Sequence, residues 1–183
     1  MKEAQGCWGD SLPDYAHPLM AIDFEVQESA PEAVAIAPPE PATVRLALEH
    51  LRPFEIVESQ FQQVGVTFKN AIALVPSNPA FPPHQGEMVL MAAPKPGCIE
   101  AHFAKPVRSV TGRVTSSHRA VMAAFDGNDQ PIAQTESRGA NLAGSEAGLP
   151  PNLALRLNAA NIRRVRFYSF DGQLTLGELS FSA

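Results

Sequence analysis

The sequence predicts an all-β fold, an antiparallel jelly-roll-like β-sandwich with an extended N-terminal arm. The first observation is compositional: 17 prolines and 12 glycines accompany only 18% charged residues, which is typical of a chain with many turns and few long helices. The second is periodic: after residue 43, short segments with alternating apolar residues recur between turn signals. We expect roughly eight to ten such strands, and an antiparallel sandwich or barrel is the simplest way to close them.

The chain is expected to divide into an arm with a linker, residues 1–43, and a sandwich domain, residues 44–183. The first half of the arm carries Trp8 and Tyr15 in a segment too short to build its own core. The second half, ESAPEAVAIAPPEPAT, favours an extended polyproline-like chain of about 3.1 Å per residue. Two placements of the arm stay open: it adds a strand to its own sandwich, or it docks on another chain.

The first half of the domain is expected to consist of short elements. Residues 43–51 alternate like a half-buried strand, although a short helix has a comparable claim there. A single helical turn is expected within 56–63. The remaining expected elements are a strand over 66–75 with a register change near Asn70, a Pro-rich loop over 76–87, strands over 88–92, 99–104 and 107–115, and a turn at Lys105 and Pro106.

The second half begins with the clearest local signal, a hairpin over 120–135. Its strands flank Asp126, Gly127, Asn128 and Asp129, residue types that tolerate positive φ. These residues only partly resemble a calcium loop, and we predict a turn. After a long loop, the expected elements are strands over 153–157 and 162–167, a turn over 170–172 and a closing strand over 174–181.

Charge and targeting signals narrow the function classes. A formal charge of -5 gives no long-range attraction for a phosphate backbone and argues against nucleic-acid binding. Cys7 and Cys98 show no metal-binding spacing and are expected to be free thiols. No run of about 18 apolar residues and no apolar signal-peptide core is visible. We therefore expect no transmembrane segment and a cytoplasmic location, with an extracellular location as the alternative.

No motif commits the chain to catalysis. Neither G-x-S-x-G nor H-E-x-x-H occurs. The five histidines lack metal-ligand spacing: His17, His50, His84, His102 and His118. A pair of carboxylates brought together by the fold stays open, because its spacing is a property of the tertiary structure. We expect that the protein is not an enzyme and holds no cofactor apart from the calcium ion considered below.

Five segments of the domain carry a resemblance to a known group of modules. They are LALEHLRPFEIVESQFQQVGVTF, IEAHFAKPVRSV, VMAAFDGNDQPIAQ, IRRVRFYS and LTLGELSF. The first segment is an opening strand with an acidic end, and the last has the pattern acidic-Leu-x-Phe. In this order, the segments resemble the strands of small jelly-roll β-sandwich modules of bacterial surface and exported proteins. These modules are related in shape to carbohydrate-binding modules. The loop PSNPAFPP is similar to that of cyanobacterial members of the group.

The resemblance also implies a metal site. It implies a calcium ion that links acidic residues of the first and last strands, which are Glu49 and Glu178 here, with help from a neighbour such as Asp171. The alternative is that Glu49 and Glu178 are solvated residues at strand ends.

Two functions from different classes follow. The first is a non-catalytic assembly subunit that docks on a larger protein complex through the arm and the sandwich surface. Its candidate partner-binding residues are Trp8, Tyr15, Leu19, Phe24, Arg163, Arg164 and Arg166. The alternative is an extracellular carbohydrate-binding module in which Phe81 and Tyr168 contact the glycan. We rank assembly first, because exposed aromatic platforms are few in the domain.

Overall fold

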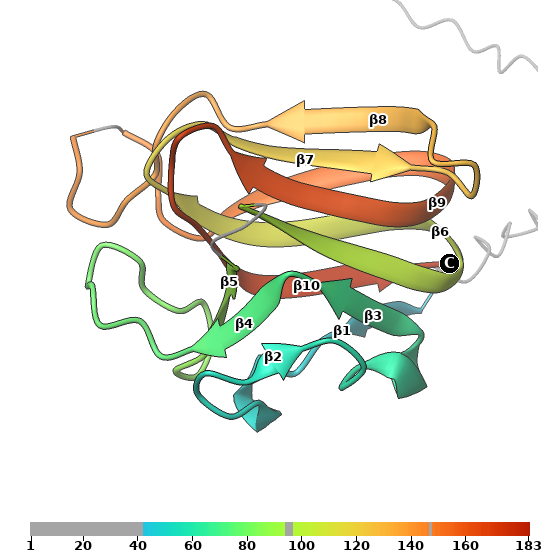
Figure 1. The fold of residues 1–183 in the computed structure, drawn as a ribbon. Helices are drawn as coiled ribbons and strands as arrows, with labels where there is room; N and C mark the ends of the chain where they lie inside the picture. The colour runs from blue at the N-terminus through green and yellow to red at the C-terminus, as the bar shows by residue number, and fades with distance from the viewer. Residues whose placement is uncertain (1–41, 94–96, 147) are drawn as a thin grey trace, which may run out of the picture. The chain divides into compact units, whose positions relative to one another are not determined.

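The computed structural model describes residues 42–93, 97–146 and 148–183, all within the compact unit Pro39–Ala183. In this part of the chain, two 3₁₀ turns, η1 (Leu48–His50) and η2 (Gln62–Val64), accompany ten strands (Figure 1). The strands are β1 (Thr43–Arg45), β2 (Ile56–Val57), β3 (Val66–Lys69), β4 (Ala71–Leu74), β5 (Val89–Ala92), β6 (Cys98–Ser116), β7 (Ala120–Phe125), β8 (Pro131–Glu136), β9 (Leu153–Ser169) and β10 (Leu174–Ser182). The predicted all-β class is confirmed.

Backbone hydrogen bonds join the ten strands into one antiparallel sheet that folds over into two facing layers. We call the first the β7 layer, and its strand order is β3, β6, β9, β7, β8. In this layer, β3 pairs with residues 100–103 of β6, and residues 98–102 of β6 pair with residues 164–168 of β9. In the second, the β10 layer, β10 pairs with residues 109–116 of β6, and β1, β5, β4 and β2 extend the other edge. The layers make an antiparallel β-sandwich.

The long strands β6 and β9 run through both layers. Their pairing register shifts between His102 and Val107, where β6 passes from one layer to the other. Lys105 and Pro106 lie in this irregular stretch and are exposed. The predicted turn at these two residues is therefore wrong. A proline donates no hydrogen bond, and the bulge lets the strand continue past it.

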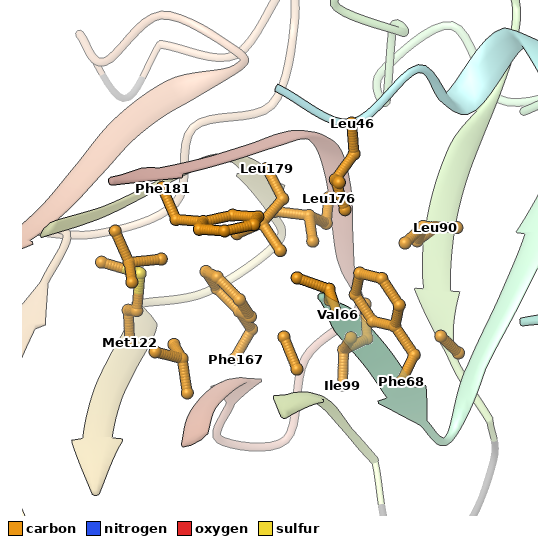
Figure 2. Close-up of a cluster of buried hydrophobic side chains, with 14 of the residues drawn as sticks. Leu46, Val66, Phe68, Leu90, Ile99, Met122, Phe167, Leu176, Leu179 and Phe181 are labelled. Atoms are coloured by element: carbon orange, nitrogen blue, oxygen red, sulfur yellow. The ribbon is translucent and has the colours of Figure 1, made fainter. Parts of the chain in front are cut away.

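The sandwich core forms where the two layers face each other. Leu176, Leu179 and Phe181 of β10 point toward Phe167 of β9 and the residues beside it, as Figure 2 shows. The rings of Phe103 and Phe181 lie 5.0 Å apart between centroids. The expected alternation of β6, with Ile99, Ala101 and Phe103 inward, holds. Burial of this apolar surface is the main force that holds the layers together.

Two other expected strands are shorter than predicted. Residues 43–51 contain β1 followed by the 3₁₀ turn η1. The expected strand therefore covers only the start of this segment, and the helical alternative holds for the three residues of η1. The strand expected over 66–75 divides into β3 and β4 at Asn70, whose φ of 60° turns the chain from one layer to the other. Asn tolerates this left-handed conformation better than most residues.

The remaining local predictions agree more closely. Residues 56–63 contain β2 and the start of η2. The hairpin expected over 120–135 is formed by β7 and β8. Asp126 Oδ1 accepts hydrogen bonds from the backbone amides of Asn128 and Gln130, at 2.8 and 2.9 Å, and closes the turn. In the described part of the chain, we find no helix with the length and apolar character needed to cross a membrane.

Candidate functional site

An open pocket of about 450 Å³ lies on the outer surface of the β10 layer. Leu74 of β4, Met91 of β5 and Thr175 of β10 line it, and these three strands are neighbours in the sheet. Side chains of a strand alternate between its two faces, and the neighbours Ala73 and Leu176 belong to the core. The pocket therefore has an apolar floor that the core does not use.

One wall of the pocket is the Pro-rich loop over 76–87. The loop is held by hydrogen bonds to the 137–152 loop beside it: Ala143 N donates to Ala80 O at 2.9 Å, and Asn152 Nδ2 donates to Pro82 O at 3.0 Å. Figure 1 shows both loops at the same end of the domain. These bonds preorganise the wall, which lowers the entropy cost of ligand binding.

Phe81, predicted as a ligand contact, lies in this wall. Its side chain is only 6% exposed, and its backbone amide donates to Asn78 O at 3.0 Å. The ring lines the pocket without projecting from the surface. Phe81 therefore shapes the wall of the pocket.

Phe54 stands at the rim of the pocket and was not predicted as a site residue. It is 82% exposed and has a φ of 66°, in the left-handed region that bulky residues avoid. Its amide donates to Ala73 O of β4 at 2.7 Å, which fixes the backbone in this conformation. Strained backbone that the surrounding structure enforces is concentrated at functional sites. The sequence signal, one Phe beside Pro53 in an irregular segment, is too weak to single it out.

Polar side chains complete the rim: Ser77, Asn78 and Gln173. The Oδ1 of Asn78 accepts from Ala80 N at 3.0 Å, an arrangement that leaves the amide NH₂ as a donor for a ligand. The pocket thus offers an aromatic ring, an apolar floor and several amide and hydroxyl groups. This combination suits a ligand with both apolar and hydroxyl surfaces.

A second, more polar hollow adjoins the first through Gln173, which lines both. Its volume is about 500 Å³, and its lining includes Ser117, Ser169 and Asp171. Tyr168 and the 68% exposed Phe170, which flank Ser169 in the sequence, form an edge-to-face pair with centroids 5.3 Å apart. Of the two predicted glycan contacts, Phe81 lines the first hollow, whereas Tyr168 lines neither hollow.

The predicted arginines lie on β9, where Arg164 and Arg166 share the outer surface of the β7 layer with Glu100. Both donate to Glu100 Oε1, Arg164 from Nη1 at 3.1 Å and Arg166 from Nε at 2.9 Å. Arg164 also donates from Nη2 to Asp129 at 2.8 Å and lies 4.0 Å from the centroid of the Phe125 ring. Arg164 is buried, so its guanidinium serves this internal network. Arg166 keeps 40% of its side chain exposed.

The charge of Glu100 depends on the same neighbours. Burial raises its pKa, but hydrogen bonds from Arg166 and His102 and the charge of Arg164 outweigh burial. The pKa of Glu100 therefore lies below its usual value, and the residue is ionised in the folded protein. Arg163 points elsewhere and donates from Nη1 to Ala104 O at 2.9 Å.

The two predicted calcium ligands differ in environment. Glu49 is exposed on η1, whereas Glu178 on β10 is mostly buried. Glu178 accepts a hydrogen bond from Arg45 and also lies 3.3 Å from His84 Nε2 and 3.9 Å from Arg113 Nε. Among the described residues, no group of three or more His, Cys, Asp or Glu side chains is placed to hold a metal. Calcium binding at Glu49 and Glu178 stays a prediction.

Residues 1–41 of the arm lie outside the described residues, and Thr43, the last residue of the predicted arm, begins β1. The predicted partner-binding residues Trp8, Tyr15, Leu19 and Phe24 lie in this part, and docking through them stays a prediction. Cys98 is a buried free thiol, as expected.

Comparison with known proteins gives structural neighbours only. No protein-family model matches the chain, and no curated protein matches it. One solved structure matched to this chain is TmCBM61 in complex with β-1,4-galactotriose, with 12% identity and a TM-score of 0.31 over 72% of this chain and 94% of that one. Another is CBM32-3 from a family 31 glycoside hydrolase of Clostridium perfringens, with 15% identity and a TM-score of 0.31 over 63% of this chain and 90% of that one. Both are carbohydrate-binding modules.

Proposed function

We propose that this protein is a non-catalytic carbohydrate-binding module whose ligand occupies the pocket beside Phe54. The observation that carries the proposal is the exposed ring of Phe54, held on a left-handed backbone at the edge of a pocket with an apolar floor. An aromatic ring in this position can stack against the C–H face of a sugar. Asn78 and Gln173, at the edge of the same pocket, can hydrogen bond to its hydroxyl groups.

The adjoining polar hollow extends this assignment to an oligosaccharide. Gln173 lines both hollows, so a chain of two or more sugar units can extend from the pocket beside Phe54 into the polar hollow. Phe54 and Phe170 add exposed aromatic surface that was not counted from the sequence, so we rank carbohydrate binding above the assembly function.

The test is retention of the full chain on an array of neutral oligosaccharides, followed by calorimetric titration with those retained. Phe54→Ala should weaken binding by at least about tenfold, the factor that corresponds to ~1.4 kcal/mol. Ile56→Ala is the matched control, because Ile56 is also exposed, at 65%, but does not line the pocket. A folded wild-type chain that binds no neutral glycan, or equal effects of the two variants, would contradict the proposal.

A further inference from the structure

A second part of the outer surface of the β10 layer has a different character from the pocket. Pairing register places Arg45, Ser180, Thr111 and Arg156 in one row across β1, β10, β6 and β9. The next row holds Thr43, Ser182, Ser109 and Asn158. Arg113, paired with Glu178, stands beside the first row. We call these residues the arginine–hydroxyl face.

The face carries more positive than negative charge. Its three arginines are Arg45, Arg113 and Arg156, and its one carboxylate is Glu178. Arg45 and Arg113 share Glu178, whereas Arg156 donates from Nε to the Thr111 hydroxyl at 3.3 Å. Within the described chain, Arg156 lies in no ion pair. A net positive surface on a chain of formal charge -5 favours an anionic ligand.

The pocket and the face are separated by the 76–87 loop. A β-carbon at Gly177 would stand 3.1 Å from the Cβ and 3.2 Å from the backbone N of His84, so this loop packs directly on β10 there. His84 in turn contacts Glu178. The arginine–hydroxyl face is therefore a surface separate from the pocket.

We propose that the arginine–hydroxyl face binds an anionic polysaccharide, whose sulfate or carboxylate groups pair with Arg45 and Arg156 while its hydroxyl groups meet Ser180 and Thr111. Neighbouring strands lie about 4.8 Å apart, so the two arginines anchor at backbone positions about 14 Å apart. At this separation, the two arginines can pair with two anionic groups of one saccharide chain, and the hydroxyl groups of Ser180 and Thr111 lie between them. Arginine suits both anions, since its planar fork matches carboxylate and sulfate oxygens.

The composition of the face favours a glycan over other polyanions. The rows contain no aromatic side chain on which the bases of a single-stranded nucleic acid could stack. They also contain no large apolar side chain of the kind that anchors a protein partner. The hydroxyl residues Ser180 and Thr111 lie between Arg45 and Arg156, and hydroxyl groups can hydrogen bond to those of a sugar.

The test is binding of the full chain to heparin, to polygalacturonate and to neutral dextran at low ionic strength. Heparin carries sulfates and polygalacturonate carries only carboxylates, so the two identify the anion that is preferred. The double variant Arg45→Gln/Arg156→Gln should weaken anionic binding by roughly tenfold or more. The control Arg52→Gln/Arg138→Gln removes the same charge from exposed residues outside the face and should have little effect.

Three results would overturn the proposal. They are failure to bind either polyanion at low salt, equal effects of the two double variants, and competition by duplex DNA as effective as that by the glycans. These results do not decide whether the pocket beside Phe54 binds a neutral glycan. Phe54→Ala should leave binding of the anionic polysaccharides unchanged, so the two proposals are tested separately.

Discussion

Gly112 of β6 lies directly against the ring of Phe167 from the opposite layer. A β-carbon built at Gly112 would stand 2.4 Å from Cε1 of Phe167 and 3.2 Å from Cδ1 of Leu176. Phe167 is fully buried, so its ring has little room to move away. The absence of a side chain at residue 112 thus lets the two layers approach closely at the centre of the core.

Gly112→Ala should therefore destabilise the domain by about 1 to 3 kcal/mol, the usual cost of overpacking a dense core. Urea unfolding followed by circular dichroism measures the change. Gly139→Ala is the control, because a β-carbon there would meet no heavy atom within 4 Å. Equal stability of the two variants would mean that the layers separate more easily than the packing indicates.

The ion pairs that Glu100 makes with Arg164 and Arg166 should contribute far more to the free energy of unfolding than an exposed ion pair does. Glu100→Ala leaves the buried Arg164 without one of its two carboxylate partners, and a loss of about 3 kcal/mol is expected. Glu136→Ala removes the exposed pair with Arg119 and should cost less than about 1 kcal/mol. Chemical denaturation of both variants makes the comparison. Similar losses would indicate that solvent reaches Arg164.

The same carboxylate predicts a pH dependence of stability. The pKa of Glu100 is lower in the folded state than its usual value, so the unfolded chain binds more protons in acid. Its contribution is present above the usual pKa of Glu, about 4.3, and is lost as the pH falls through the lower folded value. Glu100→Gln should therefore flatten the acid side of the curve of unfolding free energy against pH. A curve of unchanged shape would contradict this assignment.

His84 should titrate below its usual range. Burial lowers its pKa first, Arg113 lowers it further, and Glu178 opposes both. Arg113→Gln should therefore raise the pKa of His84, whereas Glu178→Gln should lower it. NMR titration of the imidazole protons measures both. Because the folded pKa is depressed, the contribution of His84 to stability is present above its usual pKa and is lost as the pH falls through the folded value.

Phe54 predicts a conflict between binding and stability. Its left-handed backbone costs about 1 to 2 kcal/mol for a residue with a β-carbon, and Gly removes this cost. Phe54→Gly should therefore be at least as stable as Phe54→Ala, because Ala keeps the β-carbon that disfavours this left-handed backbone. Both variants should lose glycan binding. A Phe54→Gly protein that unfolds at lower temperature than Phe54→Ala would show that the backbone strain is small.

Local sequence patterns predicted much of the secondary structure. The alternation of Ile99, Ala101 and Phe103 identified a strand with one buried side, and the Asp, Gly and Asn residues of 126–129 identified a hairpin. Both signals are carried by neighbouring residues, so no knowledge of the fold is needed to interpret them. The same reasoning failed at Lys105 and Pro106, because a bulge in a long strand and a turn have the same local composition.

The sites depended on contacts between distant parts of the chain. Glu100 meets Arg164 across 64 positions, and Arg45 meets Glu178 across 133. Sequence alone marked Phe81 and Tyr168 but could not show that Gln173 links two hollows on the surface of the folded domain. Residue types and periodicity determined that this chain forms antiparallel strands with one buried side. Strand pairing decided the rest, since register brings Leu74, Met91 and Thr175 to one pocket floor and Arg45 and Arg156 to one row.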